Sequence, residues 1–277
     1  MNSQAPLQNE QAPFHNENEQ GPIQNEQGPF QNGQGPLRNK KALVTGGSRG
    51  IGAATAVRLA REGADVAVTY VNGKEAAEDV VRAVEALGRR AVALRADSAD
   101  PEEAADAVAQ AARALGGLDV LVNNVGIGVL GPLPELSLAE VDRVLAVNVR
   151  GVFLASRAAA TRMADGGRII TVGTCMTQRV PGPGGTLYAM SKSALVGLTK
   201  ALARELGPRG ITANIVHPGP IDTDMNPADG PYAAGQSALT ALGRFGTAEE
   251  VASTVAYLAS ATYVTGAEYA VDGGHAA

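Results

Sequence analysis

Short apolar runs alternate with alanine-rich helical patterns from Lys40 onward, and this alternation most constrains how the chain can fold. The apolar runs are KALVT (41–45), DVAVTY (65–70), AVALRA (91–96), LDVLVNN (118–124), RIITV (168–172), ITANIV (211–216) and AEYAVDGG (267–274). Strands that are apolar along their length are buried on both faces, as in a parallel sheet that helices cover on both sides. We therefore predict an α/β fold, a single doubly wound domain over residues 40–277 with a seven-stranded parallel sheet.

Helix signals fill the spaces between these runs. Residues 50–63 form a helical pattern that ends at a glycine, and Tyr188–Leu206 form another. Ser137 to Glu140 reads as a capping box that opens a long helix to about Met163, and Thr247 to Glu250 caps a late helix. No second shift in composition divides residues 40–277, so we expect one domain there.

Residues 1–39 are a different kind of sequence, built from copies of a seven-residue repeat. The copies read NSQAPLQ, NEQAPFH, NEQGPIQ, NEQGPFQ and NGQGPLR. Each copy has one apolar residue and one proline, which excludes a coiled coil and buries too little apolar surface to offset the entropy of ordering. We predict a disordered low-complexity tail, which either is a solvated extension or serves as a multivalent docking segment.

The composition excludes several classes of function. The chain has 277 residues, 45% of them hydrophobic, and a formal net charge of −5 without a basic block, so we expect no nucleic-acid partner. No apolar run approaches the ~18 residues of a membrane helix. One cysteine and three histidines offer no metal cluster and fit a reducing cytoplasm. We expect a soluble cytoplasmic protein that binds neither metal nor membrane.

The first apolar run leads into TGGSRGIG (45–52) and then into a helix. Glycines between a strand and a helix let the backbone approach a pyrophosphate at the helix N-terminus, as in Rossmann-type dinucleotide-binding domains. The second strand ends without the carboxylate that NAD-preferring sites place there, whereas Arg49 and Lys74 offer positive charge. We predict NADP as the cofactor and consider NAD the weaker alternative; Lys74 has the alternative of being a solvated residue at a helix start.

Polar residues after the next two strands extend this site. Asp97 is placed to bind the adenine edge, and Asn123, Asn124 and Gly126 are expected to lie against the cofactor. For Asn124, a role in stabilising the turn is equally open.

The stretch TCMTQRVPGPGGTLYAMSK (174–192) carries the predicted chemistry. Tyr188 and Lys192 are four residues apart on one helix and therefore share a face. An ammonium beside a phenol favours the phenolate, so we expect Lys192 to lower the pKa of Tyr188 and make it a general acid. Reduction of a carbonyl also needs an upstream hydroxyl, for which Thr174, Cys175 and Thr177 are the candidates.

In these motifs the chain resembles the short-chain dehydrogenase/reductase family over essentially all of residues 40–277. The matching stretches are TGGSRGIG, NNVG (123–126), AVNVRG around Asn148, YAMSK (188–192) and PGPIDT (218–223), and the likeness is greatest to 3-oxoacyl-carrier-protein reductases. The resemblance implies that Lys192 also holds the nicotinamide ribose and that Asn148 completes a proton relay, although Asn148 could instead bond locally within its helix. It also implies a homotetramer.

Thr174 is the predicted counterpart of the family's serine. It follows RIITVG directly, where the family places that serine, whereas counting thirteen residues back from Tyr188 reaches Cys175. An extra residue in the loop 180–185 reconciles the two counts, because loops accept insertions more readily than strand ends shift register. A hydroxyl is also a better donor than a thiol.

The predicted catalytic residues are Asn148, Thr174, Tyr188 and Lys192. The predicted cofactor-binding residues are Gly46, Ser48, Arg49, Gly50, Ile51, Gly52, Asn72, Asp97, Ser98, Asn124, Gly126, Tyr188, Lys192, Pro218, Gly219, Ile221 and Thr223. The resemblance assigns Ile221 and Thr223 to the nicotinamide carboxamide, and His217 is expected to be a packed strand-end residue.

The predicted function is the NADPH-dependent reduction of a ketone or acyl-thioester substrate to a secondary alcohol. Residues 224–245 should form a lid over an apolar substrate. Arg209 matches one of the two basic residues that flank the pocket of carrier-protein reductases, and a carrier-bound substrate and a free ketone remain equally open. The alternatives are an alcohol dehydrogenase that works oxidatively and a non-catalytic NADP-binding docking protein.

Overall fold

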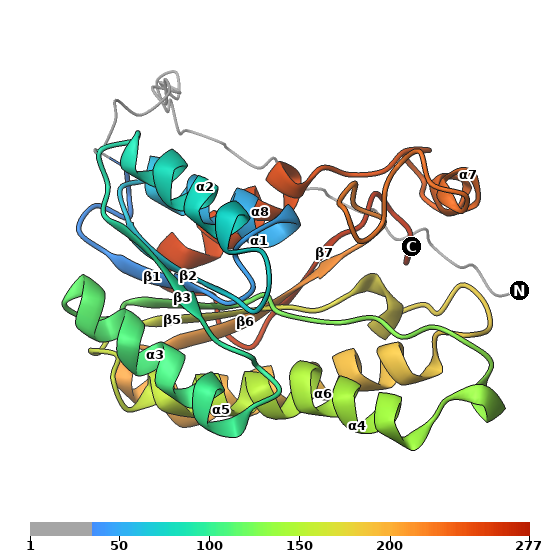
Figure 1. The fold of residues 1–277 in the computed structure, drawn as a ribbon, viewed down its shortest axis with the longest axis horizontal. Coiled ribbons are helices and arrows are strands. Elements are labelled where there is room, and N and C mark those ends of the chain that lie inside the picture. Colours follow the sequence, from blue (N-terminus) through green and yellow to red (C-terminus); the bar gives the residue numbers. More distant parts are fainter. Residues whose placement is uncertain (1–34) are drawn as a thin grey trace, which may run out of the picture.

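The computed structural model describes residues 35–277, whose centre is a seven-stranded sheet (Figure 1). The strands are β1 (Lys41–Val44), β2 (Asp65–Tyr70), β3 (Ala91–Arg95), β4 (Val120–Asn123), β5 (Arg168–Val172), β6 (Thr212–Pro218) and β7 (Glu268–Val271). All neighbours pair in parallel, in the order β3-β2-β1-β4-β5-β6-β7. The predicted fold class is confirmed, and the strand order reverses between β1 and β4, where such sheets bind ligands.

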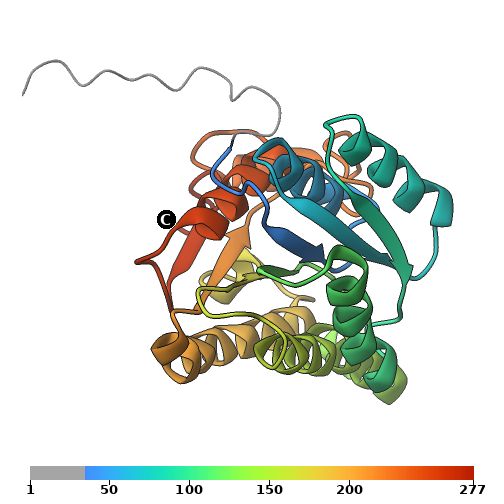
Figure 2. The same ribbon diagram turned by 90° about the vertical axis from the view of Figure 1, so that its left-hand side faces the viewer.

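Helices cover both faces of the sheet, as Figures 1 and 2 show. On one face lie α1 (Gly50–Arg61), α2 (Lys74–Glu85) and α8 (Ala248–Ser260), and on the other lie α3 (Pro101–Leu115), α4 (Leu138–Leu145), α5 (Val152–Ala160) and α6 (Thr186–Leu206). Each face has its own apolar core, one around Val44, Val122 and Val255 and the other around Leu43, Leu121 and Ile169. Because alternate strand residues enter opposite cores, the strands are apolar throughout.

The long helix expected from Ser137 to Met163 is present but interrupted. Ser137 and Glu140 form the predicted capping box at the start of α4, as Thr247 and Glu250 do for α8. Between α4 and α5 the chain widens into the π-helical turn η2 (Ala146–Gly151), and α5 ends at Ala160. A π turn accommodates one extra residue and is common at functional sites, and this one contains Asn148.

The ordered fold begins before Lys40, the predicted boundary. Leu37 is buried at 1% exposure, and its N–H donates to the Glu62 carbonyl at 2.9 Å. At Gly35 a Cβ would lie 2.5 Å from the same carbonyl oxygen, so the chain passes tightly over the end of α1. The last repeat copy therefore contributes to the core. Residues 1–34, and with them most of the predicted disordered tail, lie outside the described residues.

Short helical turns complete the connections: η1 (Leu133–Glu135), η3 (Cys175–Thr177) and η4 (Gly207–Arg209). The predicted lid, residues 224–245, contains one short helix, α7 (Ala233–Ala238). Figure 1 shows α7 and the start of α4 at the same end of the molecule, on opposite sides of the sheet. The predicted lid, residues 224–245, therefore lies at the same end of the molecule as the start of α4.

Among the helices of residues 35–277, none combines the length and apolarity that a membrane crossing requires. In the same part of the chain, no three His, Cys, Asp or Glu side chains gather as a metal site would need.

Candidate active site

The glycine loop after β1 is built around backbone that only glycine adopts readily. Gly46 and Gly50 have φ angles of 62° and 51°, in the left-handed region. The loop is tied to β2, since Gly46 N–H donates to Thr69 Oγ1 at 2.9 Å and Gly47 N–H donates to the Thr69 carbonyl at 3.0 Å. Thr69, a residue that the sequence did not single out, thus fixes the loop.

Asn124 and Thr45 hold the other side of the loop. The Asn124 side-chain amide donates to the carbonyls of Thr45 and Gly46 at 3.0 and 2.9 Å, and its backbone N–H donates to Thr45 Oγ1 at 3.1 Å. Of the two roles open for Asn124, the structure shows the turn-stabilising one.

The loop and the start of α1 suit a bound pyrophosphate. A Cβ at Gly52 would lie 2.4 Å from the Gly46 carbonyl oxygen, so only glycine lets the loop fold this closely over the helix. No side chain caps the N-terminus of α1 and its first turn holds no acid, which leaves backbone N–H groups available to an anion. Arg49 and Asn72 are exposed, and no acidic residue ends β2. These residues fit NADP.

Asp97 and Ser98 follow β3 beside this loop. The Asp97 carboxylate accepts from Ala99 N–H at 2.9 Å and pairs with Arg143 at 3.2 Å. Burial opposes its charge, but these partners outweigh burial and hold the pKa of Asp97 below its usual value. The carboxylate stays ionised and can accept from an adenine amino group only while sharing its oxygens with Arg143.

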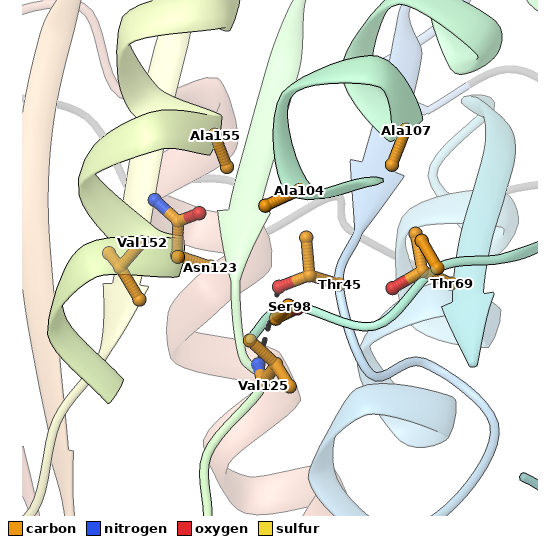
Figure 3. A pocket seen from close by; sticks show the side chains of 11 residues that line it. Thr45, Thr69, Ser98, Ala104, Ala107, Asn123, Val125, Val152 and Ala155 are labelled. Atoms are coloured by element: carbon orange, nitrogen blue, oxygen red, sulfur yellow. Dashed lines mark hydrogen bonds between the residues drawn. The ribbon is translucent and has the colours of Figure 1, made fainter. Parts of the chain in front are cut away.

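Behind the loop lies a cavity of about 10 Å³, lined by Thr45, Thr69, Ser98 and Asn123 (Figure 3), a size that suits about one water molecule. The Asn123 amide donates to Ser156 Oγ at 3.0 Å and its residue is 1% exposed. Asn123 therefore faces α5, and the expectation that it lies against the cofactor is wrong. The last residue of a parallel strand can point to either helix layer, and its neighbour Asn124 takes the other side.

Thr174, separated from β5 by Gly173, influences Tyr188 of α6. The Thr174 hydroxyl favours the Tyr188 phenolate and so acts to lower the pKa of that phenol, although burial outweighs it. Cys175 is 4% exposed, and burial, followed by the charge of Asp272, raises the pKa of its thiol to about 11. A protonated, enclosed thiol is a poor donor and nucleophile. The influence of Thr174 on Tyr188 and the protonated thiol of Cys175 therefore support the choice of Thr174.

Lys192 lies one turn further along α6, 3% exposed, with its ammonium donating to the Val172 carbonyl at 2.9 Å. Burial lowers its pKa to about 8. A Cβ at Gly126 would lie 2.9 Å from Lys192 Nζ, so Gly126 leaves room for the ammonium group.

The pKa of Tyr188 is raised, and the prediction that Lys192 lowers it is wrong. Burial of the phenol is the largest cause, and the influence of Thr174 only partly opposes it. Lys192 directs its charge to the strand end instead of the phenol. Tyr188 is thus a neutral acid, the protonation state needed to give up a proton.

Asn148, fully buried in the π turn, bonds across to other elements. Its Oδ1 accepts from Ile127 N–H and its amide donates to the Ile127 carbonyl, both at 2.9 Å, and also to Ser191 Oγ at 3.0 Å. Ser191 Oγ in turn donates to the Tyr188 carbonyl at 2.8 Å. The local helix-interior reading of Asn148 is excluded, and Ser191, next to Lys192 in sequence, joins the network.

The PGPIDT segment returns to the glycine loop. At Gly50 a Cβ would lie 3.3 Å from the Thr223 methyl group, so these two predicted cofactor residues face each other. Ile221 is 5% exposed and pairs with Gly246, which anchors the start of the lid. Gly219 packs on Asp272, where a Cβ would lie 2.6 Å from the Asp272 Cα.

Comparison with known proteins gives a consistent result. A family model described as enoyl-(acyl carrier protein) reductase matches residues 46–276. The chain is 47% identical over 236 residues to the cyclic-di-GMP-binding biofilm dispersal mediator protein of Escherichia coli (strain K12), covering 84% of this chain and 96% of that one. It is 42% identical over 240 residues to a 3-oxoacyl-[acyl-carrier-protein] reductase of Staphylococcus aureus (strain Mu50), covering 85% and 97%.

Solved structures show the same likeness and identify the cofactor. A short-chain dehydrogenase from Burkholderia cenocepacia in complex with NADP superposes with a TM-score of 0.86 at 54% identity, covering 87% of this chain and 100% of that one. BdcA in complex with NADPH superposes with a TM-score of 0.80 at 45% identity, covering 87% and 96%. Together with the glycine loop and the Thr174, Tyr188 and Lys192 site, these matches show that the chain belongs to the short-chain dehydrogenase/reductase family, in the branch like the 3-oxoacyl-carrier-protein reductases, and is an NADP-dependent oxidoreductase acting on CH–OH groups.

Proposed function

We propose that the protein reduces a ketone to a secondary alcohol with NADPH, using Tyr188 as the general acid. The observation that carries this proposal is a half-buried, neutral Tyr188 whose pKa the Thr174 hydroxyl acts to lower, one helical turn from the buried Lys192. NADPH, when bound, supplies the hydride. The glycine loop, Arg49 and Asn72 would hold its phosphates, and Lys192, Ile221 and Thr223 its nicotinamide end.

Each side chain has a distinct task in this proposal. Tyr188 donates its proton to the carbonyl oxygen as negative charge develops there, and Thr174 stabilises that oxygen and the resulting phenolate. Since the pKa of Lys192 is about 8, the group exchanges protons near neutral pH. We propose that it returns a proton to Tyr188, which lies one turn away on the same helix.

The surroundings favour a free apolar ketone over a carrier-bound one. Arg209 pairs with Asp165 at 3.0 Å and donates to the carbonyls of Ala160 and Met163, so its guanidinium is satisfied within the chain. Met225, Tyr232 and Leu242 of the lid are exposed by 66%, 77% and 65%. Apolar lid side chains that close over a substrate would recognise its hydrocarbon part.

The test is a panel of ketones and β-ketoacyl thioesters assayed with NADPH and with NADH, followed in both directions. We expect faster reduction with NADPH, and a loss of kcat of at least about 100-fold in Tyr188→Phe. Thr174→Ala should lower kcat by at least about 10-fold, whereas Cys175→Ser should leave it close to wild type. Unchanged turnover in Tyr188→Phe, or a large loss in Cys175→Ser alone, would contradict the proposal.

A second candidate function follows from the relative in Escherichia coli, whose name states that it binds cyclic-di-GMP. We propose that the glycine loop and the exposed Arg49, which would hold the phosphates of NADPH, can bind a cyclic dinucleotide instead. Calorimetric titration with cyclic-di-GMP, with and without NADPH, tests this. Competition between the two ligands supports a shared site, and the absence of binding excludes this function.

A further inference from the structure

A buried histidine contacts the segment after β5 that contains Thr174 and Thr177. His217, the penultimate residue of β6, is 0% exposed. Thr174 N–H donates to its Nδ1 at 3.3 Å, and Thr177 Oγ1 lies 3.3 Å from the same atom. None of the catalytic steps above uses this ring.

The other ring nitrogen is held by a carboxylate. His217 Nε2 lies 3.2 Å from Glu268 Oε2 on β7, and Glu268 Oε1 lies 2.8 Å from Lys200 Nζ on α6. Lys200 is the main cause that holds the pKa of Glu268 below its usual value, so the carboxylate remains an acceptor. An ionised carboxylate can only accept, which places the ring proton on Nε2 and leaves the lone pair of Nδ1 for Thr174 N–H.

The neighbouring residue is shaped for this contact. A Cβ at Gly173 would lie 2.6 Å from His217 Nδ1 and 3.1 Å from Ile215 Cδ1. Any side chain at position 173 would push the ring away from the Thr174 backbone. The glycine between β5 and Thr174 thus permits the approach of the imidazole.

These contacts fix the backbone of Thr174 on both sides. Its N–H is bound by His217, and its carbonyl accepts from Thr177 N–H at 3.1 Å and from Thr177 Oγ1 at 3.0 Å. Thr174 itself is extended, with φ −163° and ψ 148°, and caps η3 by accepting from Met176 N–H at 3.3 Å. With the main chain held, the position from which the Thr174 side chain acts on Tyr188 is fixed.

We propose that His217, oriented by Glu268, is a positioning residue that holds the Thr174 hydroxyl in line with Tyr188. The inference rests on the proposed ketone reduction, in which that hydroxyl stabilises the reacting oxygen. A donor held in place before the reaction costs no reorganisation when charge develops, and small misplacements are expensive. The ring acts through Thr174 and touches neither substrate nor cofactor in this scheme.

The test is a double-mutant cycle between His217→Leu and Thr174→Ala, measured on the best ketone of the panel. His217→Leu should lower kcat by about 10-fold while the KM for NADPH is unchanged. In the Thr174→Ala background the same change should cost less than about twofold, because the group on which it acts is already gone. His217→Asn, whose amide oxygen can replace Nδ1 as acceptor, should recover most of the lost kcat.

Asn214→Leu is the matched control, because Asn214 lies on the same strand, is 1% exposed and bonds to the Val264 carbonyl and Ala267 N–H, away from Thr174. It should lower the melting temperature as His217→Leu does, with kcat per folded enzyme unchanged. If His217→Leu does not fold, Glu268→Ala replaces it in the same cycle.

Equal losses of kcat in both backgrounds, or no recovery in His217→Asn, would overturn the positioning role. A wild-type protein that reduces no ketone would instead overturn the proposed function, so the two failures are distinguishable.

Discussion

Lys192 places a cation where water cannot solvate it. The residue is 3% exposed, and its ammonium has the Val172 carbonyl as a hydrogen-bond acceptor. Burial alone accounts for the fall of its pKa from 10.5 to about 8. Holding a proton there costs folding free energy, and in the proposed function the resulting pKa near neutral pH serves proton exchange with Tyr188.

This burial predicts a pH-dependent stability. Between about pH 8 and pH 10.5 the unfolded chain binds a proton at Lys192 that the folded chain does not, so the free energy of unfolding rises with pH in that window. Relative to Lys192→Met, which lacks the group, wild type should gain about 2 kcal/mol between about pH 8 and pH 10. Urea unfolding of both proteins at each pH measures this. A difference that stays flat with pH would mean that the ammonium remains hydrated in the fold.

At the level of residues, the sequence predicts which residues form the site better than it predicts the surroundings of each side chain. The positions of Tyr188, Lys192 and Thr174 follow from their spacing, and the structure brings them together. The raised pKa of Tyr188 does not follow, because it depends on how deeply neighbouring elements enclose the phenol. The Asp97–Arg143 pair and the His217–Glu268 contact join residues 46 and 51 positions apart, and no local pattern announces either.

Among the elements, the glycine loop and α1 show how sequence and structure agree. The strand–loop–helix order was predictable because periodicity and glycines are local signals. The π turn at Ala146–Gly151 was not, since AVNVRG is compatible with an ordinary helix and the widening depends on the bonds of Asn148 to Ile127 and Ser191. Tertiary contacts therefore decide the geometry around Asn148, a predicted catalytic residue.

The close approach within the loop predicts that Gly52→Ala impairs cofactor binding. A Cβ there would lie 2.4 Å from the Gly46 carbonyl oxygen and 2.6 Å from the Asn124 amide, so the loop must open. We expect the Kd for NADPH, measured by fluorescence titration, to rise at least about 10-fold. The control is Gly207→Ala at the end of α6, where φ is −53° and no atom lies within 4 Å of an added Cβ. An equal loss in both variants would show that the crowding in the loop is not the cause.

On the scale of the whole molecule, the fold includes part of the repeat segment. Leu37 occupies the apolar position of the last copy and joins the core formed by α1, α8 and the sheet. Composition predicted a boundary at residue 39 because each copy has one apolar residue and little surface to bury, but burial of Leu37 orders residues 35–39. The predicted tail over residues 1–34 and its possible docking role stay predictions.

Leu37→Ala in the full chain should lower the free energy of unfolding by about 2–5 kcal/mol, since it leaves a cavity at a fully buried site. Leu133→Ala, at a side chain that is 64% exposed, should change it by less than about 0.5 kcal/mol. Urea denaturation compares the two. Similar small effects would mean that residues 35–39 add little to the fold.

The homotetramer also stays a prediction, which the exposed Leu138, Phe153 and Met190 on α4, α5 and α6 support. These are the helices that the family resemblance places between subunits.

Because the strand order reverses between β1 and β4, the predicted cofactor loop and the predicted catalytic residues come from different parts of the sequence. The stretch before β4 contributes the glycine loop, Arg49 and Asn72, whereas Thr174, Tyr188 and the lid all come after it. Predicted cofactor binding and predicted substrate reduction are therefore encoded in two successive segments of the chain. Under the proposed function, a recombination crossover near Asn123 would exchange one ketone specificity for another. The preference for NADP would be unchanged, provided that Thr223 still fits against Gly50.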